Sequence, residues 1–266
     1  MLLKWIIQNK YKVMAFIVGL YVIADVVQHK GMMRVMLPVR FPLYKTDSSL
    51  PKNDNTLVNT DKEWIKGIDS KELMNSISAT SSGVEFDVYF DLPKKIFDVH
   101  HDPDHSIGLN LEDQLQVYTQ RGMKASIWLD LKNLDDSNYI SAVTTLSVLC
   151  SKYNLTNKLL VESNRADLLT VFSDRGFFTS YYIPVFNPYL LNEAEIKHWV
   201  DSVSAVINTS KVNALSGYYF QYRFLHHYFP NYPILIWAAN DRLSLVNKLY
   251  KKHIAGTKEV FIALYP

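Results

Sequence analysis

The chain has 266 residues, of which 48% are hydrophobic and 20% charged, and its formal net charge is +2. This is a globular composition, with enough length for one large domain or two small ones. So small a net charge lacks the basic surface of nucleic-acid-binding proteins, and we expect no nucleic-acid partner. The single cysteine, Cys150, excludes an intramolecular disulfide and a zinc site built from cysteines.

The N-terminus combines basic residues with an apolar run. The run covers residues 13–27, and only Gly19 and Asp25 interrupt it. The preceding lysines are Lys4, Lys10 and Lys12. This pattern predicts a signal-anchor helix over residues 1–28 or, as the alternative, a signal peptide cleaved near Val22-Ile23-Ala24. Asp25 keeps a third interpretation open, a helix buried in the fold.

Either membrane interpretation fixes the side on which the domain lies. The positive-inside rule puts the rest of the chain across the membrane, so we expect a membrane-anchored protein facing the periplasm or exterior, or else a secreted one. Residues 29–61 are predicted to be a juxtamembrane segment and linker, because 41–61 is rich in Pro, Asn, Asp and Lys. Residues 62–266 form the predicted domain, which is expected to fold without residues 1–40.

Apolar runs alternate with helical patterns through residues 62–266. The predicted strands cover 64–68, 84–90, 125–131, 158–161, 179–184, 214–218, 234–238 and 260–264. The predicted helices cover 71–79, 111–121, 139–153, 166–174, 193–204, 222–228 and 244–254. Eight strands separated by helices predict a (β/α)8, or TIM, barrel, with a doubly wound open sheet as the alternative. The run over 97–101 does not fit the alternation and is predicted to extend the second strand into a loop at the mouth of the barrel.

Two carboxylates alternate with apolar residues in the second predicted strand. Glu85 and Asp87 share one face of an extended chain, and Val84, Phe86 and Val88 share the other. Adjacent buried carboxylates are costly unless they are paired or bind a cation. A hard divalent ion, Mg²⁺ or Ca²⁺, is the simplest compensation, and a half-exposed strand with a solvated acidic face is the alternative.

The third predicted strand and the loop after the second add further polar groups. Asp130 would complete an oxygen-ligand metal site, and Lys132 on the same face suits a phosphate, although the two could instead form a structural salt bridge. His101 is a candidate general acid or base that Asp102 could orient; the alternative is an ordinary polar contact. Trp237 ends the seventh strand, where it could stack on a substrate or pack in the core.

The order of these motifs resembles that of the phospholipase-C-like phosphodiesterase superfamily, which includes glycerophosphodiester phosphodiesterases and sphingomyelinase D toxins. The motifs are Glu85-Phe86-Asp87, His101-Asp102, Asp130-Leu131-Lys132 and a late strand that ends in Trp237. The segments around Trp64 and Trp128-Leu129-Asp130-Leu131-Lys132-Asn133 look most like the menorin-like branch and its bacterial relatives. The resemblance implies a TIM barrel that binds one divalent cation through Glu85, Asp87 and Asp130.

The resemblance also implies two catalytic histidines. His101 would be one of them, but Lys66 stands where the other is expected, at the end of the first strand. Lysine is a poor base at neutral pH unless burial depresses its pKa strongly, whereas it binds phosphate oxygens well. The sequence therefore predicts a phosphodiester hydrolase acting on a glycerophosphodiester, lipid head group or envelope glycan phosphodiester. The alternative is a weak or inactive barrel that serves as a binding or assembly module.

A carbohydrate-active barrel is a weaker alternative. Glycosidases place their acid and base about 5–9.5 Å apart, typically on different strands, whereas Glu85 and Asp87 are neighbours on one strand.

Overall fold

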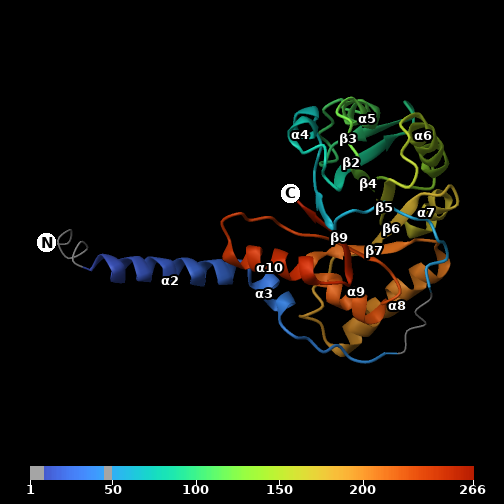
Figure 1. Cartoon of the computed structure of the whole chain (residues 1–266). Helices are drawn as coiled ribbons and strands as arrows, with labels where there is room; N and C mark the ends of the chain where they lie inside the picture. Colours follow the sequence, from blue (N-terminus) through green and yellow to red (C-terminus); the bar gives the residue numbers. More distant parts are fainter. Residues whose placement is uncertain (1–8, 45–49) are drawn as a thin grey trace. The chain divides into compact units, whose positions relative to one another are not determined.

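Eight parallel strands form a closed barrel in the computed structural model, which describes residues 9–44 and 50–266 (Figure 1). These strands are β1 (Glu63–Ile65), β2 (Gly83–Asp91), β4 (Ser126–Leu131), β5 (Leu159–Ser163), β6 (Phe178–Tyr182), β7 (Ala214–Tyr218), β8 (Ile234–Trp237) and β9 (Val260–Tyr265). Strand β1 pairs with both β9 and β2, and this double pairing closes the ring. The predicted TIM barrel is confirmed, and the open sheet is excluded.

Helices follow the strands as the sequence pattern indicated. They are α4 (Lys71–Ser76), α5 (Leu111–Gln120), α6 (Tyr139–Lys152), α7 (Ala166–Ser173), α8 (Glu193–Thr209), α9 (Tyr222–Tyr228) with the short 3-10 turn η1 (Tyr219–Gln221) before it, and α10 (Leu245–Gly256). Asn110 and Asn192 begin α5 and α8 with capping boxes, in which the asparagine side chain accepts from the backbone N–H three residues on. These caps explain why both helices begin where the polar residues stand.

A ninth strand, β3 (Ile96–Val99), lies outside the ring. It pairs antiparallel with β2, from Val88–Val99 to Asp91–Ile96. The run that did not fit the alternation is therefore the return arm of a hairpin, which extends β2 beyond the barrel. Its end carries His100 and His101 back toward the C-terminal ends of the strands.

Large side chains fill the interior of the barrel. The central cluster consists of Trp64, Trp128, Leu160, Phe178, Ala214, Leu235, Ile262 and Leu264. Trp64 and Trp128 meet edge to face, with ring centroids 6.4 Å apart. Gly83 lies directly against Trp64: a Cβ atom there would come within 1.9 Å of the indole ring. Only glycine fits at that position, so the barrel is a packed core and not a pore.

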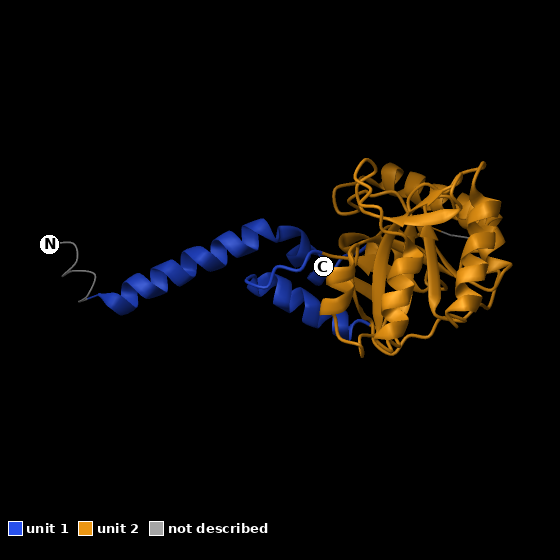
Figure 2. Cartoon of the chain, turned by 90° about the horizontal axis from the view of Figure 1, so that it is seen from above, with its two compact units in different colours: residues 1–40, 239–257 blue, residues 41–238, 258–266 orange. Residues whose placement is uncertain are grey.

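The N-terminal helices form a unit of their own together with α10. The two units are residues 1–40 with 239–257, and residues 41–238 with 258–266 (Figure 2). Helices α2 (Lys10–Gln28) and α3 (Lys30–Met36) belong to the first. Within the described residues, α2 is the one helix long and apolar enough to span a membrane, a property that signal sequences share. The predicted N-terminal helix is confirmed, and its membrane role stays a prediction.

The end of α2 contacts α10. Asp25 Oδ2 accepts hydrogen bonds from the backbone N–H groups of Leu245 and Val246, at 2.8 and 3.0 Å. Met32 and Val35 of α3 are also buried. Asp25 interrupts the apolar run because it caps another helix, and these contacts argue against removing all of residues 1–40 from a folded chain.

The predicted linker is tied to the barrel over residues 50–61. Asn55 Nδ2 donates to the carbonyls of Ser173 and Phe177, each at 2.8 Å, and Val58 N donates to Asn157 O at 2.8 Å. The segment forms no helix or strand there, yet its amides are used as fold contacts. Residues 45–49 of the predicted linker and Lys4 of the basic N-terminus lie outside the described residues.

Candidate active site

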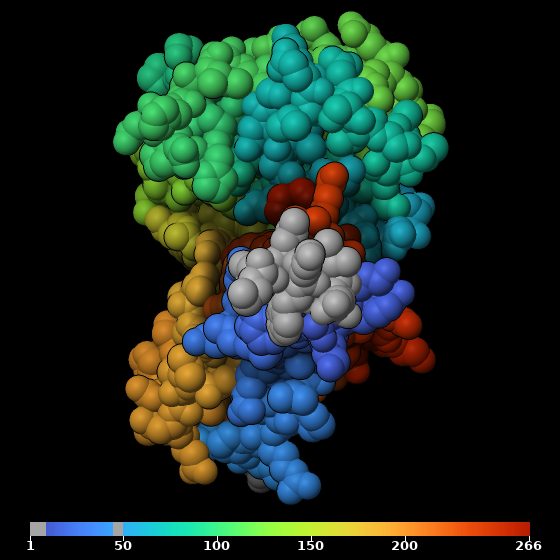
Figure 3. Space-filling view, turned by 90° about the vertical axis from the view of Figure 1, so that its left-hand side faces the viewer, coloured from blue at the N-terminus to red at the C-terminus, as the bar shows by residue number. Residues whose placement is uncertain are grey.

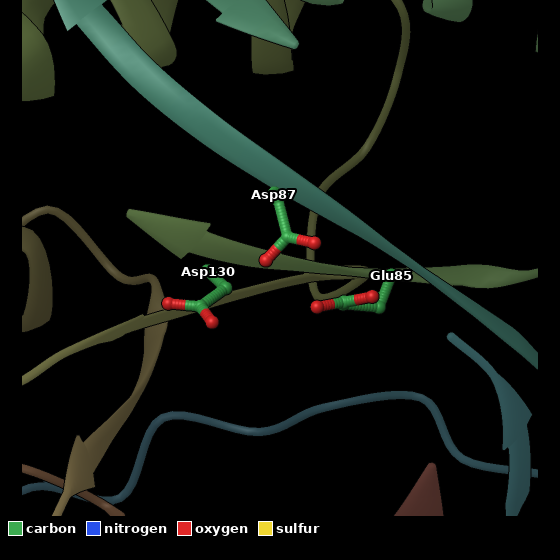
Figure 4. Close-up of side chains that lie close together, drawn as sticks. All are labelled: Glu85, Asp87 and Asp130. Atoms are coloured by element: carbon green, nitrogen blue, oxygen red, sulfur yellow. The ribbon is translucent and has the colours of Figure 1, made fainter. Parts of the chain in front are cut away.

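Three carboxylates converge at the C-terminal mouth of the barrel. Asp87 of β2 and Asp130 of β4 are paired in register, and Glu85 lies two residues before Asp87 on the same face. One oxygen atom of each lies within 4.8 Å of the others. Figure 4 shows the three groups turned toward one another from the two strands. The predicted convergence of Glu85, Asp87 and Asp130 is confirmed.

Glu85 and Asp87 are buried, and the Asp130 side chain is largely buried. Burial and the charge of Asp87 raise the pKa of Glu85 well above its ordinary value, although its Oε2 accepts a 2.6 Å hydrogen bond from Gly67 N. Burial also raises the pKa of Asp130. The fold thus holds negative charge together at a cost, which a bound cation would relieve.

Two lysines lie beside the acids. Lys132 Nζ is 2.6 Å from Asp87 Oδ1 and also pairs with Asp130. Burial acts to lower the pKa of Lys132, but Asp130 and Asp87 outweigh it and hold the pKa above its ordinary value. Lys66 lines the same cavity, and its charge favours the ionised forms of Glu85 and Asp130. Lys66 therefore lines the mouth, as expected from the sequence, and the Asp130–Lys132 salt bridge, which was the alternative to a phosphate-binding role for Lys132, is present.

The three carboxylates fit a hard divalent cation. Ligands at about 2.3–2.6 Å from one ion lie at most about 5 Å apart, and the donor set is all oxygen. Oδ2 of Asp87 is buried and has no hydrogen-bond partner among the described residues. A cation would meet this oxygen and compete with Lys132 for the others. Glu85, Asp87 and Asp130 are therefore the residues that would hold it.

The two histidines after β3 differ in their surroundings. His101 lines the cavity and is 61% exposed, with Nδ1 2.9 Å from Asp102 Oδ1. His100 is buried: its ring stacks on Tyr89 at 4.3 Å, and its Nδ1 contacts the carbonyl of Asp102 at 2.7 Å. The expectation that Asp102 orients His101 agrees with these contacts, and the buried His100 is held by contacts within the fold.

The mouth encloses a cavity of about 210 Å³. Trp237 lines it, with Tyr182 against the indole at a centroid distance of 4.8 Å and an edge-to-face angle of 76°. Trp237 is thus placed to contact a ligand and packs on a neighbour as well, so both interpretations of this residue are consistent with its position.

Sequence reasoning missed two acids of the site. Glu162 of β5 lies in register with Asp130, lines the cavity and is buried, and its Oε2 has no hydrogen-bond partner among the described residues. Burial and Asp130 raise its pKa, although Ser216 and Ser180 oppose the rise. We predicted this strand to end at Val161, so Glu162, the next residue, was not considered. Its position directly after the predicted strand is the signal that could have found it.

Asp69 is the second missed acid. Its Oδ1 accepts a hydrogen bond from Asp87 N at 3.3 Å, which ties the loop after β1 to β2. Burial, and then the charge of Asp87, raise the pKa of Asp69 to about 6. Its sequence signal was its place directly after the first predicted strand, 64–68, although β1 itself ends at Ile65.

The chain is similar in fold to solved phosphodiesterases. A glycerophosphodiester phosphodiesterase from Thermotoga maritima aligns at 18% identity and a TM-score of 0.50, over 78% of this chain and 95% of that one. A phosphodiesterase from Oleispira antarctica, solved with the product sn-glycerol-3-phosphate, aligns at 14% identity and 0.51, over 77% and 92%. A protein assigned as a glycerophosphoryl diester phosphodiesterase from Silicibacter pomeroyi aligns at 10% identity and 0.54, over 79% and 91%.

No protein-family model matches the sequence, and no curated protein matches it. The structural likeness spans nearly the whole of each solved chain and about four fifths of this one. The predicted resemblance is confirmed in fold. The barrel is similar in fold to those of solved glycerophosphodiester phosphodiesterases, while membership of their superfamily and the menorin-like branch stay predictions.

Proposed function

We propose that this chain is a metal-dependent phosphodiester hydrolase. The observation that carries the proposal is the convergence of Glu85, Asp87 and Asp130 beside two lysines in one cavity. Three oxygen ligands suit one Mg²⁺ or Ca²⁺, and the lysines suit the anionic oxygens of a phosphodiester. The substrate class is a glycerophosphodiester, lipid head group or envelope glycan phosphodiester, in keeping with the sn-glycerol-3-phosphate found in the Oleispira antarctica protein.

Each residue has a distinct role in this proposal. A bound divalent cation supplies Lewis-acid polarisation of the phosphoryl group. Lys132 and Lys66 bind the non-bridging oxygens and stabilise the charge that develops on them. His101, held by Asp102, gives a proton to the leaving oxygen or takes one from the attacking hydroxyl. Trp237 forms the wall against which the alcohol part of the substrate rests.

The protein is proposed to act from a membrane. In this proposal helix α2 is a single-pass anchor with Lys10 and Lys12 in its first turn, and the positive-inside rule would then put the barrel in the periplasm or outside the cell. A cleaved, secreted form is the alternative. In both cases the substrate is met outside the cytoplasm.

One observation favours a second function. The cavity offers Lys66 where the resembling enzymes are expected to carry a histidine, and Lys132 already neutralises two of the three acids. A barrel of this kind binds a phosphodiester without turning it over. The alternative function is therefore a binding or assembly module.

Turnover and metal content separate the two functions. The full-length protein in detergent is assayed against a panel of phosphodiesters, with Mg²⁺, with Ca²⁺ and with a chelator, and its metal content is measured. We expect chelator-sensitive hydrolysis that Asp130→Asn abolishes and Asp201→Asn, on the exposed face of α8, leaves intact. Saturable binding of a phosphodiester with neither bound metal nor turnover would establish the module instead.

A further inference from the structure

Glu162 is a buried acid of the mouth that the cation site does not use. Its side chain lines the cavity, although the residue is only 2% exposed. The three carboxylates whose oxygen atoms lie within 4.8 Å of one another do not include Glu162. Lys132 pairs with Asp87 and Asp130, whereas no residue that the structure describes forms an ion pair with Glu162. Its Oε2 also has no hydrogen-bond partner among them.

The barrel residues next to Glu162 are small and polar. Ser180 of β6 is paired in register with Glu162, and Ser216 lies on the next strand, β7. Neither hydroxyl forms a hydrogen bond with Oε2 of Glu162. Ser216 Oγ donates to Tyr181 O at 3.3 Å, while Oγ of Ser180 is buried and has no partner within the described part of the chain. Two paired residues thus hold an acceptor and a hydroxyl that the fold does not satisfy.

The cavity has two chemically different sides. The two lysines and the three carboxylates come from β1, β2 and β4 or from the residue that follows each strand, so they lie on consecutive strands of the ring. Tyr182 of β6 and Trp237 of β8 form an aromatic side, and Glu162 of β5 lies between the two. Leu264 of β9 completes the lining, where Figure 3 shows dark red atoms of the C-terminal end of the chain beside teal atoms of its first half.

Charge decides which part of a bound phosphodiester meets Glu162. Anionic phosphoryl oxygens are attracted by the lysines and a cation and repelled by a carboxylate, so the alcohol part lies toward Glu162. Tyr182 and Trp237 are then its apolar walls. The cavity of about 210 Å³ is smaller than the about 300–1,000 Å³ of pockets for drug-sized ligands, so this alcohol is small. The last torsion of a glutamate is broad and two-fold, so either oxygen of Glu162 can turn toward the ligand.

We propose that Glu162 sets the specificity of the site for an alcohol that carries a hydrogen-bond donor, a hydroxyl or a primary ammonium, close to its ester oxygen. The proposal rests on the proposed function and deepens it, because it names the class of phosphodiester that the cavity selects. Glu162 accepts a hydrogen bond from this donor. An alcohol without a donor displaces water and leaves the buried carboxyl oxygen unpaired, which is a strong basis for rejecting it.

Three phosphate monoesters that differ only in their alcohol test this selection. The alcohol of sn-glycerol 3-phosphate carries hydroxyls, that of phosphoethanolamine carries an ammonium, and that of propyl phosphate carries neither. Their binding to the full-length protein in detergent with Ca²⁺ is measured by titration calorimetry. The titrations are repeated with Glu162→Met, which removes both oxygens at similar side-chain length, and with Glu162→Ala. Glu112→Met is the matched control, because Glu112 pairs with Lys152 on the outer helices.

We expect the native chain to bind an ester with a donor about tenfold or more tightly than propyl phosphate. In Glu162→Met the ratio should fall to near one without a loss of melting temperature, because Glu162 has no partner to lose, and the control should keep the ratio. Glu162→Ala gives the same comparison if the methionine does not fit. Preference for sn-glycerol 3-phosphate identifies the donor as a hydroxyl, and preference for phosphoethanolamine identifies it as an ammonium.

Three results would overturn the role of Glu162. Equal binding of all three esters by the native chain would remove the selection and leave the phosphate site standing. A native preference that persists in both Glu162 variants would assign the selection to other residues. Binding of none of the esters, with Ca²⁺ present, would remove the proposed function and the selection together.

Discussion

Asp25 and Asp87 are both buried, at 6% and 0% exposure, but their oxygen atoms meet different surroundings. Asp25 Oδ2 accepts two backbone hydrogen bonds, and Oδ1 lies 2.9 Å from Nδ1 of His29. Asp87 has Lys132 on one oxygen and no hydrogen-bond partner on the other among the described residues. The first carboxylate is fully used by the fold, and the second is not.

The difference separates structural acids from ligand-binding ones. An unsatisfied buried oxygen costs about 1–3 kcal/mol, and more when it is charged, so a fold that keeps one needs another reason for it. Oε2 of Glu162 repeats the situation of Asp87 in the same cavity. The barrel mouth thus keeps carboxylate oxygens without a partner among the described residues, which supports the proposed cation site, whereas Asp25 is used by the helix unit.

Among the substitutions considered, Asp87→Asn should have the largest effect, and the quantity affected is the affinity for a divalent ion. It removes one anionic ligand from the trio and one partner from Lys132, so we expect divalent-ion affinity to fall by more than about 100-fold. Titration calorimetry with Mg²⁺ and Ca²⁺ measures the loss. Asp25→Asn is the matched control, because it changes a buried aspartate outside the barrel unit and should leave ion binding unchanged. Equal losses in both variants would mean that the fold, and not the site, responds.

In the metal-free protein the free energy of unfolding should fall as the pH rises, and a bound divalent ion should reverse this trend. The pKa of Asp69 is about 6 in the folded chain against its ordinary 3.8, and that of Glu85 is also raised. Between these pH values the folded state binds more protons than the unfolded one, so the free energy of unfolding falls as pH rises through this window. Metal-free protein should melt higher near pH 5 than near pH 7.5.

A divalent ion should act only above that window. It needs ionised ligands, so it should raise the melting temperature near pH 7.5, by an amount equivalent to about 2.7 kcal/mol at 100-fold excess over its Kd, and hardly at all near pH 5. Calorimetry near pH 5 and near pH 7.5, with and without Ca²⁺, tests both the pH trend of the metal-free protein and the effect of the ion. Asp87→Asn should lose the rise at pH 7.5. The same rise at both pH values would show that the ion binds elsewhere.

The alternation of apolar runs and helical patterns predicted the barrel because each strand and each helix is a local feature. The sixth helix and the sixth strand, predicted over 222–228 and 214–218, match α9 and β7 to the residue. Glu85, Asp87 and Asp130 were predictable because period-2 parity and position at a strand end are also local. Lys66 reached the mouth although β1 ends at Ile65, three residues earlier than predicted.

What the sequence hid depends on distant pairing. Glu162 directly follows a predicted strand, which is a local signal, but its register with Asp130, which brings it to the carboxylates, is set by pairing between strands. Asp25 looked like a flaw in an apolar helix because its partners, Leu245 and Val246, come about 220 residues later. The role of such residues follows only from the assembled fold.

Substitution of Asp25 should lower the stability of the chain without lowering its activity. Asp25→Ala leaves two α10 amides without their acceptor, which should cost about 1–3 kcal/mol, or a few degrees in the melting temperature. Deleting residues 2–24 should be tolerated, whereas deleting 2–40 also removes buried Met32 and Val35 and should destabilise the chain further. Thermal unfolding in detergent compares the three proteins. Full stability of the longer deletion would contradict the packing on α10.

Lys66 is expected to give the smallest effect, on binding. It lines the cavity with Glu85 and Asp130, and a lysine ammonium is a point positive charge suited to an anionic oxygen, so we expect it to act as an anion clamp. Lys66→Ala should weaken binding of a non-hydrolysable phosphodiester about tenfold, because a charged hydrogen bond contributes about 1.5 kcal/mol. Calorimetry with the ion present measures it. Lys248→Ala, on α10, should change nothing.

Lys66→His tests the role of Lys66 through hydrolysis, where Lys66→Ala tests it through binding. An imidazole at this position would face the cavity that His101 lines and would supply the second acid–base group that the resembling enzymes are expected to use. We expect hydrolysis to rise, or to begin if the native chain only binds its ligand, with a bell-shaped pH profile that reports the two histidines. Strong turnover in the native chain that collapses in Lys66→His would make the lysine itself catalytic. That result would assign Lys66 a role in proton transfer and not in anion binding. The lysine at the position of the expected histidine would then be part of the catalytic mechanism.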